Sequence, residues 1–322
     1  MGYYTVDIPT ILAESDYHRI LKNVLSKLAT VNGIEAVYQI GGIGTPGISD
    51  LDLVLVFEDD LICNYNLHEQ LSKEEKYLFI HRLYGCSRKN FHESSRFSFF
   101  HNFSLIAGHE IQRDHERNET EVNLIKTQIA LEYMLKMYTN IMLQKEYGIL
   151  QVRSLLLHGK ALKFDLDFLN VDSAALNQSV KHLIDIRNSW FKDENNVSHL
   201  TKWFEEFICI YSEVLSSILN VRGIYMHGDG AFRIAKNISI CKAESLACHR
   251  TGMKLPAFAA MVLGKKYFRA QNRLNSFEIR VPFKNTDFPE SLQKYFKFQA
   301  GQREYNRKFL PYFYPLSSSL LA

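Results

Sequence analysis

Two aspartates at the start of an apolar segment are the residues of this chain best placed to do chemistry. Asp50 and Asp52 follow a glycine-rich turn at residues 41–47 and lead into the apolar run 53–57. Side chains alternate along a strand, so both carboxylates point to the same side. Two carboxylates that close repel each other unless a cation lies between them. Because Mg²⁺ takes oxygen ligands from carboxylates and substrate phosphates, the pattern predicts a metal site beside a phosphate-binding loop.

The same stretch resembles the signature of the polymerase-β-like nucleotidyltransferase superfamily over about residues 30–60. That signature is a hydrophobic residue, Gly followed by Gly or Ser, a loop, and Asp-hydrophobic-Asp on a strand. The matching residues here are Ile40, Gly41, Gly42, Asp50, Leu51 and Asp52. The resemblance implies transfer of a nucleoside monophosphate from a nucleoside triphosphate, ATP among them, to an acceptor, with two Mg²⁺ ions. Seven residues separate Gly42 from Asp50, fewer than the family usually carries, so the loop could hold the triphosphate differently or not at all.

The resemblance also implies roles for individual residues. Asp50 and Asp52 would be catalytic and would hold both ions, one at the triphosphate and one at the acceptor hydroxyl. The residues expected to contact the nucleotide are Gly41, Gly42, Thr45 and Ser49. Glycine lets backbone N–H groups approach phosphates with no Cβ in the way, and the two hydroxyls would add donors. Ser49 fits equally well as a turn residue.

Active members of the family carry a third acid on a later strand. The strand expected here at 96–106 contains no Asp or Glu. Glu110 is therefore the best candidate for the third catalytic carboxylate, and Asp114 is the next. If neither reaches the metal ions, the chain is a catalytically silent module of this fold that binds or scaffolds. The acceptor stays open between a small molecule, a sugar, a protein hydroxyl and an RNA end.

Two other motifs compete for a functional interpretation. The glycines of residues 42–47 also spell G-x-G-x-x-G, but a dinucleotide fingerprint needs a helix directly after it, and here a strand follows. His227 and Asp229 belong to a His-Gly-Asp sequence similar to that of small-molecule phosphotransferases. Those enzymes follow it with an Asn and a metal-binding Asp. No Asp stands between Asn237 and Asp287, which favours a glycine-rich turn.

The composition indicates the cellular location of the protein and the classes of partner that it is expected to lack. The net charge of +3 over 322 residues argues against a long nucleic acid as partner. Five cysteines without a C-x-x-C pair make a disulfide framework or a structural zinc site unexpected. The first residues lack the pattern of a signal peptide, and no stretch reaches the length of a membrane span. We therefore expect a cytoplasmic protein with no membrane partner.

Hydrophobic periodicity predicts an α+β fold, with a small mixed nucleotidyltransferase-type sheet followed by a mainly helical domain. The first part is expected to contain helices at 15–30 and 67–83 and strands at 37–40, 51–57 and 96–106. Apolar residues then recur at helical spacing from residue 119, and further helices are expected at 149–164, 174–191 and 199–219. Residues 221–322 are less regular. The expected domains are residues 1–117 and 118–322.

Three segments carry more specific expectations. The run 53–57 is apolar on both of its alternating faces, which is typical of a strand inside a sheet that helices cover. The run 265–273 interleaves bases with aromatic residues. It could clamp phosphates or stack on bases, although a solvated helix face with apolar anchors is favoured. The apolar tail at 309–314 is expected to dock on the body of the protein or on a second subunit of a homo-oligomer.

Overall fold

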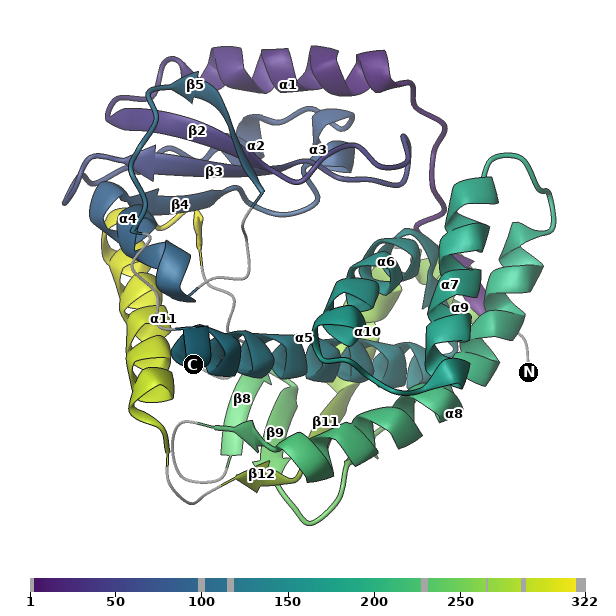
Figure 1. The fold of residues 1–322 in the computed structure, drawn as a ribbon. Helices are drawn as coiled ribbons and strands as arrows, with labels where there is room; N and C mark the ends of the chain where they lie inside the picture. Colours follow the sequence, from purple (N-terminus) through teal and green to yellow (C-terminus); the bar gives the residue numbers. More distant parts are fainter. Residues whose placement is uncertain are drawn as a thin grey trace. The chain divides into compact units, whose positions relative to one another are not determined.

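The chain divides into two compact units. The computed structural model describes residues 3–97, 102–114, 119–226, 231–264, 266–284 and 288–316. The sheet unit comprises Thr10–Ile129 and Pro289–Leu320, and the helical unit comprises Met1–Pro9 and Ala130–Phe288. Both helices and strands are abundant, and the strands form several separate sheets (Figure 1). The protein is therefore of mixed α+β class, as the sequence predicted.

The boundary between the units lies inside the long helix α5 (Glu119–Tyr147). The C-terminal segment from Pro289 belongs with the N-terminal sheet, although most of the chain separates the two in sequence. The division predicted from sequence, residues 1–117 and 118–322, places this C-terminal segment in the second domain, whereas it packs with the N-terminal sheet. Periodicity identifies elements, but it does not say which unit a late segment packs against.

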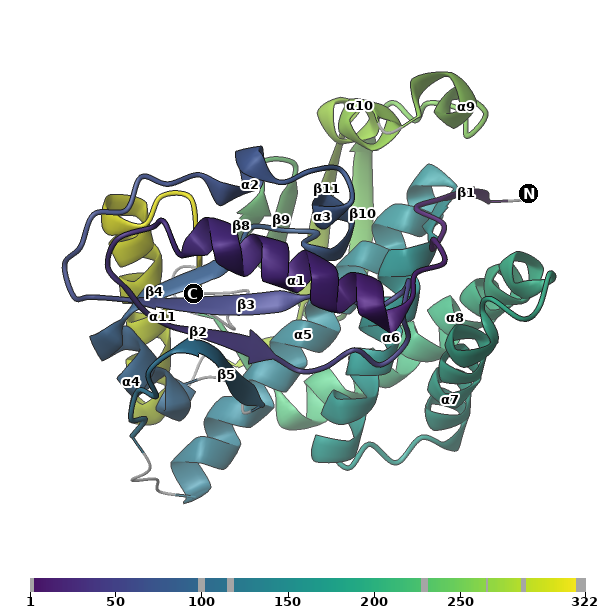
Figure 2. The same ribbon diagram turned by 90° about the horizontal axis from the view of Figure 1, so that it is seen from above.

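The sheet unit is built on one five-stranded mixed sheet with the order β13-β4-β3-β2-β5. Its strands are β2 (Ile34–Ile40), β3 (Asp52–Phe57), β4 (Tyr84–Ser87), β5 (Phe103–Gly108) and β13 (Tyr314–Pro315). β2 is antiparallel to both β3 and β5, whereas β3, β4 and β13 are parallel. The loop at residues 41–51 joins the antiparallel strands β2 and β3, and the parallel pair β3–β4 requires a longer crossover. Figure 2 shows β2, β3 and β4 side by side.

Helices cover both faces of this sheet, as the apolar character of β3 predicted. Leu53, Leu55 and Phe57 pack into a core with the buried face of α1 (Glu14–Leu28). Val54 and Val56 pack into the opposite core, which includes a phenylalanine of α4 (Arg88–Phe97). In Figure 1, α1 runs along one face of the sheet and α4 lies against the other. Because alternation places Asp52 on the side of Val54, its carboxylate lies toward the α4 face.

The helix expected at 67–83 is wrong. Two single-turn helices occupy this crossover, α2 (Leu67–Gln70) and α3 (Glu75–Leu78). Between them Leu71 has an extended backbone, and Ser72 and Glu75 form a reciprocal capping box. The Ser72 hydroxyl accepts from the Glu75 N–H, and the Glu75 carboxylate accepts from the Ser72 N–H. Such a cap starts a new helix, and after Leu78 the chain runs on to β4 without further helix.

The strand expected at 96–106 is also displaced. Its beginning is the end of α4, and β5 starts only at Phe103. Aromatic residues around this boundary favoured a strand. In the structure Phe91, Ser94 and Ser95 are buried at helical spacing, so one face of α4 packs on the sheet.

Gly108, at the end of β5, is a position where the fold requires glycine. Its φ is +84°, and a Cβ would lie 2.1 Å from the Glu35 carbonyl oxygen and 2.9 Å from the Ala36 Cα. We expect Gly108→Ala to lower the free energy of unfolding by about 3 kcal/mol, because backbone atoms of a paired strand cannot move aside. Urea unfolding followed by circular dichroism measures the change.

Gly301→Ala is the matched control for this prediction. Gly301 lies in the exposed part of α11 (Glu290–Phe309), where a Cβ would meet no described atom within 4 Å outside its own turns. The substitution should raise the free energy of unfolding by about 0.5–1 kcal/mol, since alanine is the better helix former. Similar losses of stability in both variants would contradict the assignment of Gly108 to a backbone clash.

The apolar tail docks on the sheet unit, in agreement with the first of the two sequence expectations. Leu310 and Phe313 are buried in the core beneath α1, and Leu316 is buried in the core beneath α4. The Asn306 amide of α11 donates to the Gly85 carbonyl of β4 at 2.9 Å. The tail then forms β13 at the edge of the sheet, next to β4.

Long helices dominate the helical unit, and the helices predicted beyond residue 119 are confirmed. They are the second part of α5, then α6 (Val152–Phe168), α7 (Ala174–Ser189) and α8 (Asn196–Arg222). Within α8 the rings of Trp203, Phe207 and Tyr211 stack one on the next, with centroids 4.5 and 5.0 Å apart.

The N-terminal strand β1 (Tyr4–Val6) pairs with β6 (Ile149–Gln151). No helix among the described residues has both the length and the apolar character to cross a membrane.

The part of the chain after residue 221 is more regular than its sequence indicated. It holds a four-stranded sheet with the order β10-β11-β9-β8. Its elements are β7 (Ile224–Tyr225), β8 (Ala231–Ala235), β9 (Ile238–Lys242), β10 (Ala247–Gly252), α9 (Ala259–Leu263), α10 (Lys266–Leu274), β11 (Asn275–Val281) and β12 (Phe283–Lys284). These strands alternate polar and apolar residues over short lengths, which is a weak signal. In α10 Tyr267 and Gln271 are buried while the bases are exposed, as expected for a solvated helix face.

Candidate metal centre

Asp50, Asp52 and His81 meet at one end of the five-stranded sheet. Each offers one ligand atom, and these atoms all lie within 4.8 Å of one another. All three residues are partly exposed, so an ion could reach them from solvent. Within the part of the chain that the structure describes, no other trio of histidine, cysteine or acidic side chains meets this spacing. The two aspartates predicted to share a cation thus lie close together, and an imidazole joins them.

The register of the sheet places the two aspartates. β2 ends at Ile40, which pairs with Asp52 at the first position of β3. The turn between the strands carries Asp50 back to the same end, and the Leu51 N–H donates to the Leu78 carbonyl at 3.0 Å. This hydrogen bond fixes the residue between the two acids against the crossover. The carboxylates therefore sit where the sheet begins, and not along its buried length.

The parallel pairing of β3 and β4 brings His81 to the same place. Parallel strands have their N-terminal ends side by side, and His81 comes three residues before β4 begins at Tyr84. Its Nε2 lies 2.9 Å from Oδ1 of Asp52. Its Nδ1 lies 2.6 Å from the carbonyl oxygen of Arg82. A carbonyl oxygen only accepts hydrogen bonds, so Nδ1 carries a proton. Nε2 faces a carboxylate, which also only accepts, so a bound ion would take the place of the proton on Nε2.

The electrostatics of the site follow from this geometry. Burial favours the neutral imidazole of His81, but the hydrogen bonds with Asp52 and the Arg82 carbonyl and the charge of Asp50 outweigh it and raise its pKa. Burial, followed by the charges of Asp52 and Asp50, raises the pKa of the neighbouring Tyr84 as well. Both shifts have the direction expected where negative charge is concentrated. The acids therefore concentrate negative charge here, and a metal ion would compete with the proton on His81 for it.

Ser49 acts as a turn residue in this structure. Its hydroxyl oxygen accepts hydrogen bonds from the N–H groups of Gly44, at 3.2 Å, and Thr45, at 3.0 Å. Ser49 is buried, whereas Thr45 is partly exposed. Of the two hydroxyls predicted to bind nucleotide, that of Ser49 is thus committed to the turn, and that of Thr45 lies nearer to solvent.

Two tyrosines hold the rest of the turn. The Tyr17 hydroxyl donates to the Ser49 carbonyl at 2.7 Å and accepts from the Gly47 N–H at 2.9 Å. The Tyr77 hydroxyl donates to the Gly47 carbonyl at 2.5 Å. The loop before the acids is therefore a fixed structure, anchored by α1 and α3.

The two predicted phosphate-binding glycines differ in their backbone conformation. Gly41 has a φ of +69°, and its N–H donates to the Asn102 carbonyl at 3.1 Å, so this amide is used within the sheet unit. Both glycines are exposed, and a Cβ at either would meet no described atom within 4 Å, so they differ in backbone conformation and not in the space beside them. The space beside Gly42 is therefore open, as a loop that receives a ligand requires.

Glu110, the predicted third carboxylate, does not belong to this cluster. β5 is antiparallel to β2, with Phe103 opposite Ile40 and Gly108 opposite Ala36. β5 therefore starts near the acids and runs away from them, and the exposed Glu110 follows its far end, roughly 20 Å along the strand direction. Asp114, the second choice, forms an ion pair with Arg96 of α4. The assignment failed because the strand direction was not known from sequence.

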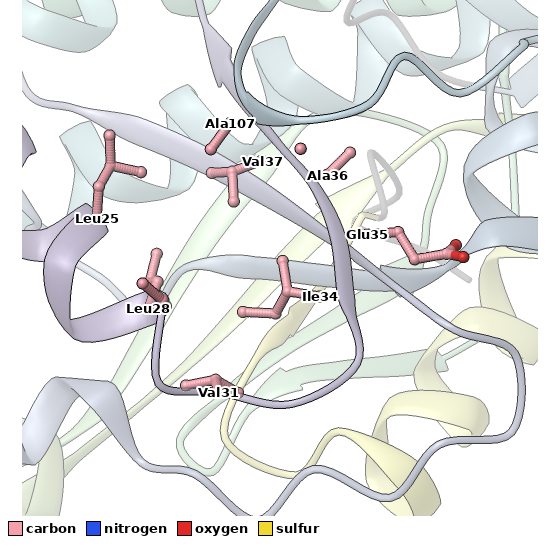
Figure 3. A pocket seen from close by; sticks show the side chains of 10 residues that line it. Leu25, Leu28, Val31, Ile34, Glu35, Ala36, Val37 and Ala107 are labelled. Carbon is pink, nitrogen blue, oxygen red and sulfur yellow. The ribbon is translucent and has the colours of Figure 1, made fainter.

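Hollows in the sheet unit lie at both ends of the sheet. The larger one, shown in Figure 3, is lined by α1, β2 and the end of β5, with apolar side chains and Glu35. It lies at the end of β2 opposite to Asp52 and contains none of the predicted site residues. A smaller hollow is lined by His68, His81, Arg82 and Tyr312 and adjoins the metal centre.

His81 is the residue that sequence reasoning missed. It was placed inside an expected helix, where it would have no relation to the aspartates. Recognition of a strand at 84–87 that is parallel to β3 would have placed His81 near the aspartates, because the residues before such a strand lie next to the start of β3. The alternative phosphotransferase residues, His227 and Asp229, lie outside the described residues.

Comparison of the chain with protein-family models, with curated proteins and with solved structures finds no match. The chemistry of the site therefore has to be inferred from its own residues. Two carboxylates and an imidazole are common ligands of divalent cations in proteins. The arrangement can hold such a cation at the end of a sheet, next to a rigid turn with an open glycine.

Proposed function

We propose that this chain transfers a nucleoside monophosphate from a nucleoside triphosphate to an acceptor, with the help of a divalent cation. The convergence of Asp50, Asp52 and His81 beside the turn that contains Gly42 carries this proposal. A bound divalent cation would neutralise the triphosphate and lower the pKa of an acceptor hydroxyl. The resemblance to the polymerase-β-like nucleotidyltransferases supplies the reaction class, with two Mg²⁺ ions as the expected cofactor.

The residues of the chain have separate roles in this proposal. Asp50 and Asp52 hold the cation, and their fixed position comes from the start of β3. Gly42 leaves space for a phosphate to approach the backbone. Tyr17 and Tyr77 keep the turn in its shape through hydrogen bonds to Gly47. The acceptor is a small molecule, a sugar, a protein hydroxyl or an RNA end, the four classes expected from the sequence.

One observation favours a second candidate, a silent module that binds nucleotide without transfer. The N–H groups of Gly41, Gly44 and Thr45 all donate to acceptors within the protein. These amides are therefore not available to a triphosphate unless the turn rearranges. Activity measurements separate the two candidates, because only the enzyme releases pyrophosphate.

The test is incubation of the chain with each α-³²P-labelled nucleoside triphosphate, a divalent cation and pools of small molecules, sugars, proteins and RNA. Transfer predicts pyrophosphate release and a labelled acceptor with at least one triphosphate. Removal of metal with EDTA should reduce release at least about 100-fold, and added Mn²⁺ or Mg²⁺ should restore it. Nucleotide binding without release in any pool would instead support the silent module.

A further inference from the structure

The ligand set at the metal centre differs from the set that the resemblance implies. A nucleotidyltransferase of that kind holds Mg²⁺ with carboxylates, and a third acid completes the site. Here the third side chain within 4.8 Å is an imidazole, and no further acid among the described residues joins the group. We infer that the centre binds a first-row transition ion through Asp50, Asp52 and Nε2 of His81, in preference to Mg²⁺. This inference rests on the metal site of the proposed function.

The orientation of the His81 ring suits metal binding. Its Nδ1–H donates to the Arg82 carbonyl, and this leaves Nε2 as the atom facing Asp52 Oδ1 at 2.9 Å. Metal-binding histidines usually donate their other ring N–H to a carbonyl or a carboxylate in this manner, which fixes the tautomer. The ring is therefore set to bind an ion that lies between it and the acids.

Two tyrosine rings lie next to the imidazole. The His81 ring lies 5.2 Å from the Tyr84 ring and 5.6 Å from the Tyr314 ring, measured between centroids. These tyrosines come from adjacent parallel strands, and both rings pack against the His81 ring. Its Nε2 is thus held in place before any ion arrives, so little conformational freedom is lost on binding.

The three donors are two carboxylates and one imidazole nitrogen. Mg²⁺ prefers oxygen ligands in a near-octahedral arrangement and keeps much of its water. Imidazole suits Fe²⁺, Ni²⁺ and Zn²⁺, and affinity at mixed N and O sites rises from Mn²⁺ to Cu²⁺. Three protein ligands also leave coordination positions open, as in catalytic zinc sites. The imidazole therefore shifts the preference of the site away from Mg²⁺.

Titration of the nucleotide-free chain with Co²⁺ and with Mg²⁺ tests this inference. Visible absorption of bound Co²⁺ reports its ligand field, and calorimetry gives both affinities. We expect Co²⁺ to bind at least about 100-fold more tightly than Mg²⁺. His81→Gln should weaken Co²⁺ binding about 10- to 100-fold and change Mg²⁺ binding by less than about threefold.

Two further variants sharpen the test. His81→Asp provides a third carboxylate, so the ratio of Co²⁺ to Mg²⁺ affinity should fall toward that of an all-oxygen site. His92→Gln is the matched control, because His92 Nδ1 also contacts a backbone carbonyl, that of Gln112 at 2.9 Å, and His92 is not part of the cluster. It should leave both affinities unchanged. Circular dichroism checks that each variant is folded.

The inference is overturned if the wild-type chain binds Mg²⁺ as tightly as Co²⁺. It is equally overturned if folded His81→Gln or His81→Asp keeps the wild-type ratio of affinities. Neither measurement involves nucleotide transfer. A chain that binds Co²⁺ as expected but releases no pyrophosphate would refute the proposed reaction and leave the metal assignment standing.

Discussion

Replacement of Asp50 by Asn will reduce pyrophosphate release at least about 1,000-fold, which corresponds to about 4 kcal/mol of lost transition-state stabilisation. Asparagine has the shape of aspartate but lacks the charge that binds a divalent cation. The free energy of unfolding should change by less than about 1 kcal/mol, because Asp50 is only partly buried and removal of its charge relieves repulsion with Asp52. Steady-state release and urea unfolding measure the two quantities.

Asp59→Asn is the control for this loss. Asp59 is an exposed acid beyond the opposite end of β3, where its carboxylate accepts the Lys89 N–H at 3.0 Å. Its replacement removes the same charge from the same unit, roughly 20 Å from Asp52 along the strand direction, and should leave pyrophosphate release unchanged. Folded Asp50→Asn protein that keeps more than about a tenth of the wild-type rate would refute the catalytic role of Asp50.

Replacement of Asp165 by Asn will make the helical unit more stable at neutral and alkaline pH. Asp165 lies in α6, is only 6 % exposed, and burial raises its pKa to about 8. In the unfolded chain the same group has a pKa of about 3.9. Between these values the folded state holds a proton that the unfolded state releases, so the free energy of unfolding falls as pH rises.

The size of this effect follows from the difference between the two pKa values. Each pKa unit corresponds to about 1.4 kcal/mol, so the contribution of Asp165 amounts to about 5 kcal/mol between pH 4 and pH 8. Asparagine is neutral throughout, and the variant should lose most of this pH dependence. Urea unfolding of both proteins at a series of pH values gives the comparison.

Asp167→Asn provides the matched control on the same helix. Asp167 is exposed and forms an ion pair with Lys163 one turn earlier. Exposed pairs of this kind contribute well under about 1 kcal/mol. Its replacement should leave the pH dependence of unfolding as it is in the wild type. If Asp165→Asn and Asp167→Asn gave the same pH profile, the buried acid could not be the source of the dependence.

The sequence was sufficient where one element alone determines the outcome. Residues 53–57 are apolar on both alternating faces of the predicted strand, which predicted burial of both faces. The two cores of the sheet unit confirm this prediction. The two aspartates also lie together, although Asp50 belongs to the turn before β3 and not to the strand itself. The long helices α5 to α8 were also recognised, because their apolar stripes repeat over many turns.

The errors arose where neighbouring segments decide the structure. Leucine spacing at 67–83 suggested one helix, but the capping box of Ser72 and Glu75 divides the segment. Glu110 was favoured by its closeness in sequence, yet the antiparallel direction of β5 carries it to the other end of the sheet. His81 could be found only through the parallel pairing of β3 with β4, which is a long-range property.

The position of a bound ion in crystals of the chain grown with Co²⁺ tests the metal centre most directly. Anomalous diffraction at the cobalt edge should show one peak about 2.1 Å from carboxylate oxygens of Asp50 and Asp52 and from Nε2 of His81. No peak at this end of the sheet in crystals with Co²⁺ bound elsewhere, or aspartate side chains that diverge, would contradict the site on which the proposed function depends.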